Sequence, residues 1–340
     1  MAIRMIVAGM GQRGRDWARE VRADARFELA ACVDVNADAL REAANGLAVA
    51  PERCFTQVES ALDQTACEAL IVATDADHHT NACHAALARG LGVLVEKPFT
   101  LRLSEAVELV ELAEQKGVPL VVAQNYRYMR AHRAARRLIR EGALGRIATV
   151  VSQYYRVPHM MAASLARLPH SVMWGMGVHH IDALRYVLGA EITSVAAQSF
   201  TPPWSELPEG SSLQVMLAFD SGARGLYSAT YESSGHEFFE RGQEFYQRFV
   251  GERATLHVFH RWLVLCERGR LPRLVRRGPR AVTEENILLE QMRRALLDGE
   301  TPESSGRDNL RTVAVMEACV RSSTERRWIN PQELLEHGIN

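Results

Sequence analysis

IRMIVAGMGQRG, the stretch from Ile3 to Gly14, joins a short apolar run directly to the glycine pattern GxGxxG. Apolar residues recur at helical spacing after it, so the stretch predicts a strand, a tight turn and a helix. In such a unit Gly9 permits the turn, Gly11 lets the backbone approach a pyrophosphate, and Gly14 lets helix and strand pack closely. The helix N-terminus then faces the anion, so a dinucleotide site is predicted here.

A second apolar run, Leu29 to Val33, ends at Asp34, which comes 20 residues after Gly14. At the end of a second strand, a carboxylate can accept hydrogen bonds from both ribose hydroxyls of NAD. The same carboxylate would repel the 2′-phosphate of NADP, and the next arginine along the chain is Arg41. The sequence therefore favours NAD over NADP. The alternative is a glycine-rich turn in some other α/β fold.

Strands and helices continue to alternate through the first third of the chain. Apolar strands are predicted at residues 69–73, 93–95 and 119–123, with helices between them. In an open parallel sheet, ligands bind outside the carboxyl ends of the strands. We expect one crevice to collect the residues that follow these ends, which are Gly9, Asp34, Thr74, Lys97, Gln124 and Asn125.

Lys97 is unusual for this chain, because only two of its 40 lysine and arginine residues are lysines. The other, Lys116, precedes Gly117 at the predicted exposed end of a helix. Burial can tune the pKa of an ammonium group, whereas a guanidinium stays charged. Lys97 is therefore a candidate for proton or hydroxyl chemistry. The alternative is an ordinary surface lysine.

Length and composition set limits on the class of protein. A chain of 340 residues predicts two domains, which we place at residues 1–123 and 124–340. With a net charge of −1, no overall field would recruit nucleic acid or a membrane surface. No apolar run reaches the ~18 residues of a spanning helix, and the first strand leaves no room for a signal peptide. Six cysteines without CxxC spacing suggest reduced thiols and a cytoplasmic protein.

The pattern changes after about residue 124. Alternating apolar residues at 213–219, a turn at 220–222 and a returning strand at 224–231 predict an antiparallel hairpin. Further strands are predicted at 147–157, 247–250, 255–259 and 262–266, and helices at 132–140, 284–297 and 307–326. The second domain is thus predicted to be an α+β layer with an open, mainly antiparallel sheet. Its C-terminal helix can pack back on the first domain.

A helix expected at residues 177–188 carries the histidine of most interest. Its apolar stripe lies on one face, while His179 and Asp182 lie on the opposite face. His179 is therefore expected to meet water or line a cleft, and an imidazole with a pKa near ~6.5 suits proton transfer at neutral pH. The two side chains could also begin a metal site, but no third ligand accompanies them, so no metal is predicted.

These motifs together resemble the glucose–fructose oxidoreductase / inositol dehydrogenase (Gfo/Idh/MocA) family. The resemblance rests on the strand–GxGxxG–helix unit, Glu96-Lys97-Pro98, Asn125-Tyr126-Arg127 and the run from Gly177 to Asp182. It implies a Rossmann domain followed by a domain whose open sheet often forms the interface of a homo-oligomer. It also implies hydride transfer between NAD(P) and a hydroxyl-bearing carbon of a sugar, cyclitol or related compound.

By this resemblance Lys97 would hold the reacting oxygen and His179 would act as acid and base. The cofactor site would comprise Gly9, Gly11, Gln12, Arg13, Gly14, Asp34, Thr74, His79, Glu96, Lys97 and Asn125. Second-domain candidates for a polar, carbohydrate-like substrate, with acidic compounds included, are Arg156, His159, His180, Asp182 and Tyr231.

One position departs from the family pattern. Members commonly carry an aspartate four residues before the histidine, and Gly175 occupies that position here. His159, His170 or a carboxylate of the substrate are alternatives for its role. Three hypotheses therefore remain open: an NAD-dependent sugar or polyol dehydrogenase, an enzyme that uses the cofactor without net redox change, and a non-catalytic NAD-binding sensor or scaffold.

Overall fold

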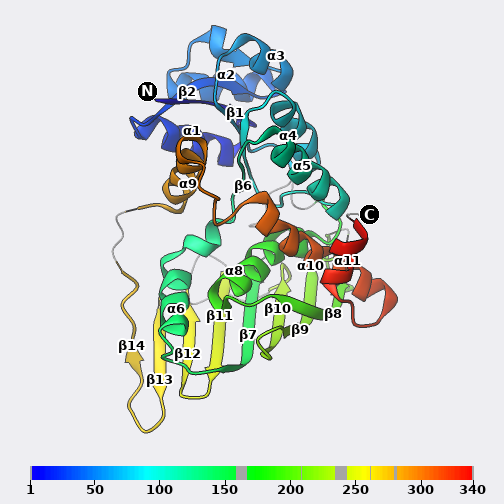
Figure 1. Ribbon diagram of the computed structural model, residues 1–340. Helices are drawn as coiled ribbons and strands as arrows, with labels where there is room; N and C mark the ends of the chain where they lie inside the picture. Colours follow the sequence, from blue (N-terminus) through cyan, green and yellow to red (C-terminus); the bar gives the residue numbers. More distant parts are fainter. Residues whose placement is uncertain are drawn as a thin grey trace. The chain divides into compact units, whose positions relative to one another are not determined.

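The computed structural model describes residues 2–157, 167–207, 209–233, 243–260, 262–278 and 282–338. The chain forms two compact units (Figure 1). The first comprises Met1–Asn125 and Val282–Leu310, and the second comprises Tyr126–Ala281 and Arg311–Asn340. The sequence placed one division after residue 123 and allowed the C-terminal helix to pack back on the first domain; the later segment that belongs to the first unit is Val282–Leu310.

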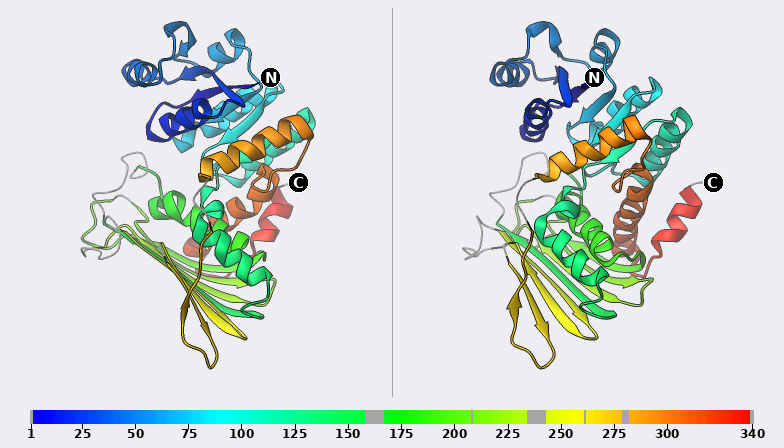
Figure 2. Two further views of the ribbon diagram at one scale, coloured as in Figure 1. Left: turned by 90° about the vertical axis from the view of Figure 1, so that its left-hand side faces the viewer. Right: turned by 60° about the vertical axis from the view of Figure 1, so that its left-hand side comes forward.

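The first unit is built on a six-stranded parallel sheet in the order β3-β2-β1-β4-β5-β6, which confirms the predicted Rossmann arrangement. Its strands are β1 (Ile3–Ala8), β2 (Phe27–Val33), β3 (Cys54–Phe55), β4 (Ala69–Val72), β5 (Gly92–Val95) and β6 (Leu120–Val122). Every residue of β4, β5 and β6 is buried, as expected for parallel strands with both faces covered by helices (Figure 2). The helices between strands are α1 (Gln12–Ala23), α2 (Ala37–Leu47), α3 (Val58–Gln64), α4 (His79–Ala88) and α5 (Leu103–Lys116).

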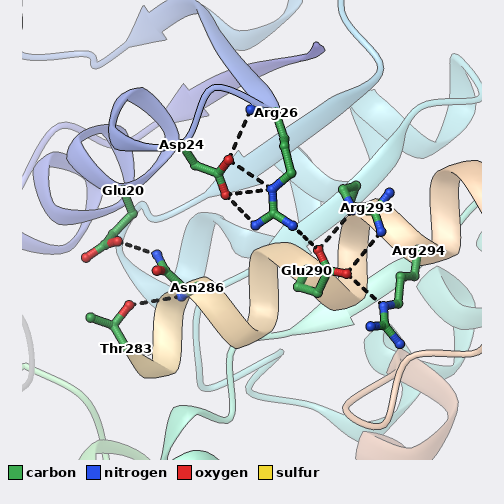
Figure 3. Close-up of polar contacts among 8 residues, drawn as sticks. All are labelled: Glu20, Asp24, Arg26, Thr283, Asn286, Glu290, Arg293 and Arg294. Atoms are coloured by element: carbon green, nitrogen blue, oxygen red, sulfur yellow. Dashed lines mark hydrogen bonds and ion pairs between the residues drawn. The ribbon is translucent and has the colours of Figure 1, made fainter. Parts of the chain in front are cut away.

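Helix α9 (Glu284–Asp298) explains why the late segment belongs to the first unit. Its apolar side buries Leu288, Leu289 and Met292, and Met292 reaches Gly92 of β5 so closely that a Cβ there would lie 2.6 Å from its Cε. Polar contacts add to this packing: the Asn286 amide donates to Glu20 at 2.5 Å, and Arg26 pairs with Glu290 at 2.7 Å (Figure 3).

The second unit contains an eight-stranded sheet in the order β14-β13-β12-β11-β7-β10-β9-β8. Its strands are β7 (Ile147–Arg156), β8 (Ile192–Phe200), β9 (Ser212–Phe219), β10 (Arg224–Thr230), β11 (Gln243–Gly251), β12 (Ala254–Phe259), β13 (Leu263–Glu267) and β14 (Arg273–Leu274). Among the strand pairs that the described residues form in this second sheet, β7 and β10 run parallel and the others run antiparallel. The mainly antiparallel sheet and the β9–β10 hairpin are therefore confirmed.

Strand β8 was not predicted, because polar residues interrupt its apolar alternation. It forms an edge of the sheet, where unpaired backbone groups need partners. The hydroxyls of Ser322 and Ser323 accept hydrogen bonds from its Ala197 and Ser199 amides, each at 2.9 Å. The end of helix α10 (Gly306–Glu325) thus protects this edge.

Helices cover one face of this sheet and leave the other open (Figure 2). They include α6 (Arg130–Arg140), α8 (Val178–Leu188) and the later part of α10, followed by α11 (Pro331–Gly338). On the open face Met216, Leu226 and Phe259 are exposed. No helix in the described part of the chain is both long and apolar enough to cross a membrane.

Candidate functional site

The three glycines of the first turn are required for different reasons. Gly9 has a φ of +88°, and a Cβ on it would lie 2.5 Å from the Ala73 carbonyl. A Cβ on Gly14 would lie 1.6 Å from the Gly9 oxygen. Packing within the unit thus demands both residues. A Cβ on Gly11 would meet nothing within 4 Å, so packing among the described residues does not require a glycine there.

A cavity of about 410 Å³ lies beside this turn, at the carboxyl ends of β1, β2 and β4. Gly9, Gly11, Asp34 and Thr74 line it, as expected from the sequence, together with Thr56, Gln57, His78 and Asn81, which were not predicted. Thr56 and Gln57 were missed because β3 is only two residues long, although the βα alternation signals a strand between α2 and α3. The remaining predicted cofactor residues, Gln12, Arg13, Gly14, His79, Glu96, Lys97 and Asn125, are not among the lining residues.

Asp34 connects the glycine turn to the end of β2. Its Oδ2 accepts a hydrogen bond from the Met10 amide at 2.6 Å, and its Oδ1 accepts one from the Asn36 amide at 2.8 Å. The side chain is partly exposed at the cavity. A carboxylate offers about four lone-pair directions, so Asp34 keeps acceptor capacity toward a ligand while the two amides hold it in place.

Gly11→Ala should weaken NAD binding without destabilising the protein, because the added methyl group would enter open space that the sequence motif assigns to a pyrophosphate. We expect a loss of about tenfold or more in affinity, which is about 1.4 kcal/mol, measured by calorimetric titration with NAD. Gly46→Ala is the matched control, since a Cβ on Gly46 also meets nothing within 4 Å and Gly46 does not line the cavity. Equal NAD affinities in the two variants would contradict this role for Gly11.

Arg13 and Glu96, both predicted to contact the cofactor, contact each other in the structure. The Arg13 guanidinium pairs with Glu96 at 2.7 Å and with Glu285 at 3.0 Å. The indole Nε1 of Trp17 also donates to Glu96, at 2.9 Å. These side chains connect α1, the end of β5 and the start of α9.

His79 holds together the two loops that follow β4 and β5. Its Nδ1 lies 2.8 Å from the Pro98 carbonyl oxygen and its Nε2 lies 3.1 Å from that of Thr74. The ring is almost completely buried, and burial lowers the pKa of His79. His79 thus lies between the loops that follow β4 and β5, beside the Thr74 carbonyl.

Lys97 directly follows Glu96 at the carboxyl end of β5 and is partly exposed. Burial lowers the pKa of its ammonium group to about 8; the negative charge of Glu96 opposes this shift, and the positive charge of Arg13 adds to it. A group with this pKa can both donate and accept a proton close to neutral pH.

His179, in the second unit, lies in a helix that is buried on nearly every side. Its ring stacks on that of Tyr126, with centroids 4.2 Å apart and planes 15° apart, and only 5% of the residue is exposed. Of the two places expected for His179, water or the wall of a cleft, exposure to water is therefore not what the structure shows, because the ring of Tyr126 covers the imidazole.

Asp182, His180 and Tyr231 were candidates for substrate binding, and all three are fully buried. Asp182 accepts two hydrogen bonds from Arg127, each at 2.6 Å, and a third from the Thr312 hydroxyl at 2.9 Å. The Nδ1 of His180 lies 2.8 Å from the Tyr227 hydroxyl. The structure thus places Asp182 and His180 in polar contacts inside the unit.

Other second-domain candidates have different environments. Arg156 is partly exposed; burial raises the pKa of Tyr231, and the positive charge of Arg156 opposes that rise. His159 lies outside the described residues.

Two further positions bear on the missing aspartate. The Nδ1 of His170 lies 2.9 Å from the Ser199 hydroxyl. Gly175 is buried in a π-helical turn, Met173–Gly177, that leads into α8. The described residues contain no group of three or more His, Cys, Asp or Glu side chains suited to a metal ion.

Comparison with known proteins agrees with this geometry. Residues 3–124 match the family described as "Oxidoreductase family, NAD-binding Rossmann fold", and residues 132–270 match the "GFO/IDH/MocA C-terminal domain". The chain belongs to the Gfo/Idh/MocA family. The resemblance inferred from the motifs is thereby confirmed, and this Gfo/Idh/MocA protein carries both domains of the family.

Its relatives include dehydrogenases. The D-apiose dehydrogenase of Paraburkholderia graminis is 26% identical over 328 residues, which cover 90% of this chain and 84% of the relative. Solved structures with the same fold include the following two. An oxidoreductase from Agrobacterium radiobacter in complex with NAD+, L-tartaric acid and magnesium has a TM-score of 0.88 and 19% identity, covering 98% of this chain and all of that one. An inositol dehydrogenase homolog from Azotobacter vinelandii with NADH and myo-inositol has a TM-score of 0.84 and 22% identity, covering 97% and 98%.

Proposed function

We propose that this Gfo/Idh/MocA protein is an NAD-dependent oxidoreductase that transfers hydride between nicotinamide and a hydroxyl-bearing carbon of a sugar, sugar acid or cyclitol. The observation that carries the proposal is Lys97, a half-buried lysine with a pKa near 8, in the same unit as a cavity built from Gly11 and Asp34. Relatives that act on or bind apiose, inositol and tartaric acid support a polyhydroxylated substrate.

The residues of the first unit fit NAD. Gly11 leaves room for the pyrophosphate at the N-terminus of α1, where backbone amides favour an anion. Asp34 can accept hydrogen bonds from the ribose hydroxyls. When bound, NAD exchanges a hydride at its nicotinamide ring. In our proposal Lys97 binds and orients the reacting oxygen of the substrate, and His179 exchanges a proton with it.

A panel of sugars, sugar acids and cyclitols, incubated with purified protein and NAD, tests the proposal by the appearance of NADH absorbance. We expect reduction of NAD with at least one member of the panel. If NAD binds but no member is oxidised, the dehydrogenase proposal fails and the second candidate gains support. That candidate is an NAD-binding protein without net redox turnover, and the specific observation that favours it is Gly175 in place of an aspartate.

Asp34→Ala should reduce the preference for NAD over NADP. The substitution removes the charge that repels the 2′-phosphate and the acceptor for the ribose hydroxyls, and a hydrogen bond to a charged group contributes about 1.5–3 kcal/mol. We expect the ratio of kcat/KM for NAD to that for NADP to fall by about tenfold or more. An unchanged ratio would show that Asp34 does not select the cofactor.

We also propose a homo-oligomer formed through the open face of the second sheet. Met216 and Leu226 are paired in the register of β9 and β10 and are 47% and 53% exposed. Exposed apolar groups on one sheet face are typical of an interface. Light scattering should show a multiple of the 37.9 kDa chain mass, and Leu226→Glu should shift the protein toward the monomer.

A further inference from the structure

The Glu96 carboxylate is held at both oxygens although it precedes the proposed catalytic lysine. Its Oε1 accepts hydrogen bonds from the Arg13 Nε at 2.8 Å and from the Trp17 indole at 2.9 Å. Its Oε2 accepts one from the Lys97 backbone amide at 3.2 Å. Only 5% of Glu96 is exposed, so its negative charge is placed by these partners and not by water.

Arg13 is itself fixed from a second side. Its other terminal nitrogen pairs with Glu285 at 3.0 Å, and its guanidinium carbon lies 5.7 Å from the centre of the Trp17 ring. Glu285 is in the first turn of α9, the helix that the contacts in Figure 3 attach to α1 and to Arg26, the residue before β2. Arg13 therefore lies between two carboxylates from segments far apart in the sequence.

Without Arg13, Glu96 would be a buried carboxylate next in sequence to an ammonium group. Opposite charges within ~4–6 Å shift a pKa by ~1–3 units toward the charged form, and an unpaired buried carboxylate strongly favours a new partner. Lys97 is a cation whose charge interacts with that of Glu96, and its backbone amide already donates a hydrogen bond to this carboxylate. The lysine would then be bound to Glu96 when it should bind substrate.

We propose that Arg13 is a positioning residue for Lys97: it holds the Glu96 carboxylate in an ion pair and so keeps this carboxylate from pairing with the lysine. The inference rests on the proposed function for the reaction that Lys97 serves. The charges that act on the Lys97 ammonium agree with it, since Glu96 raises its pKa and Arg13 lowers it while burial brings it to about 8. His79, the nearby titratable group of α4, adds little charge because burial lowers its pKa.

The presence of only two lysines makes a direct test possible. With a trace amount of acetic anhydride, the acetylation rate of each lysine follows its neutral fraction, and mass spectrometry reads Lys97 separately from the exposed Lys116. In Arg13→Gln we expect the pKa of Lys97 to rise by about one to two units. Arg19→Gln is the control, because Arg19 is on the same helix, pairs with Asp16 at 2.8 Å and is 59% exposed. Arg19→Gln should leave the pKa of Lys97 at its wild-type value.

A second variant separates this effect from unfolding, which would also raise the pKa of Lys97, toward the ~10.4 of an unperturbed lysine. In Arg13→Gln/Glu96→Gln the competing carboxylate is absent, so the pKa should fall back to the wild-type value or below. An unfolded chain would show no such reversal. An unchanged pKa in Arg13→Gln, or a raised one that persists in the double variant, would overturn the proposal.

Labelling requires no turnover, so the test is independent of the proposed function. If NAD reduction is found, the pH dependence of kcat should move in Arg13→Gln in the same direction as the labelling pKa, and not in Arg19→Gln. A labelling shift without turnover on any substrate would support the arrangement around Lys97 and count against the dehydrogenase. Turnover without a labelling shift would support the dehydrogenase and overturn the proposed role of Arg13.

Discussion

Lys97→Met is expected to lower kcat by about 10²–10⁴-fold, the range for disabling a positioned proton transfer, while NAD affinity stays nearly unchanged. Methionine keeps the length and apolar stem of lysine but cannot bind the substrate oxygen and orient it for proton exchange with His179. NAD affinity should persist because Lys97 is not among the residues that line the cavity beside Gly11.

The matched control is Lys116→Met, which replaces the other lysine, an exposed residue at the end of α5. It should turn over like the wild type on the substrate found in the panel. NADH formation gives the rate and calorimetry gives the affinity for NAD. If Lys97→Met were as fast as Lys116→Met, Lys97 would have no part in the reaction.

Arg127→Met is expected to destabilise the second unit by about 3–5 kcal/mol, because it leaves the Asp182 carboxylate buried without its main partner. Both side chains are almost completely buried, at 4% and 0% exposure. Urea denaturation should show the loss as a lower midpoint. Arg146→Met is the control: its pair with Glu252 is 90% and 52% exposed, and exposed pairs contribute about 0–1 kcal/mol.

The same experiment distinguishes a structural Asp182 from a substrate ligand. Replacing both partners by apolar residues, as in Arg127→Met/Asp182→Leu, should recover much of the stability, because neither member of the pair is left as an unpaired buried charge. The buried Arg185, which lies 3.6 Å from Asp182, keeps its ion pair with Glu191 at 2.7 Å. A substrate ligand would behave differently: Asp182→Asn would raise KM while the urea midpoint stayed near that of the wild type. That outcome would restore the role inferred from the sequence.

Local patterns were enough to predict much of the fold. The GxGxxG turn, the strands that end at Asp34 and before Glu96, and the hairpin of β9 and β10 were all predicted, because each depends on residues close in sequence. The two-residue strand β3 and the polar edge strand β8 were missed, since neither has a clear apolar period. The return of α9 to the first unit depends on packing against Gly92, almost 200 residues earlier.

The candidate site likewise has features that local sequence predicts and features that depend on tertiary packing. By itself, the sequence determined which residue types follow the strand ends, because the positive φ of Gly9 and the close approach of Gly14 to the Gly9 oxygen are requirements of the turn itself. Only the tertiary structure decided that Arg13 pairs with Glu96 and that Arg127 pairs with Asp182. The physical reason is that burial and charge pairing depend on which distant surfaces pack together. A buried charge must find a partner among the side chains that the fold brings beside it, however far away they are in the chain.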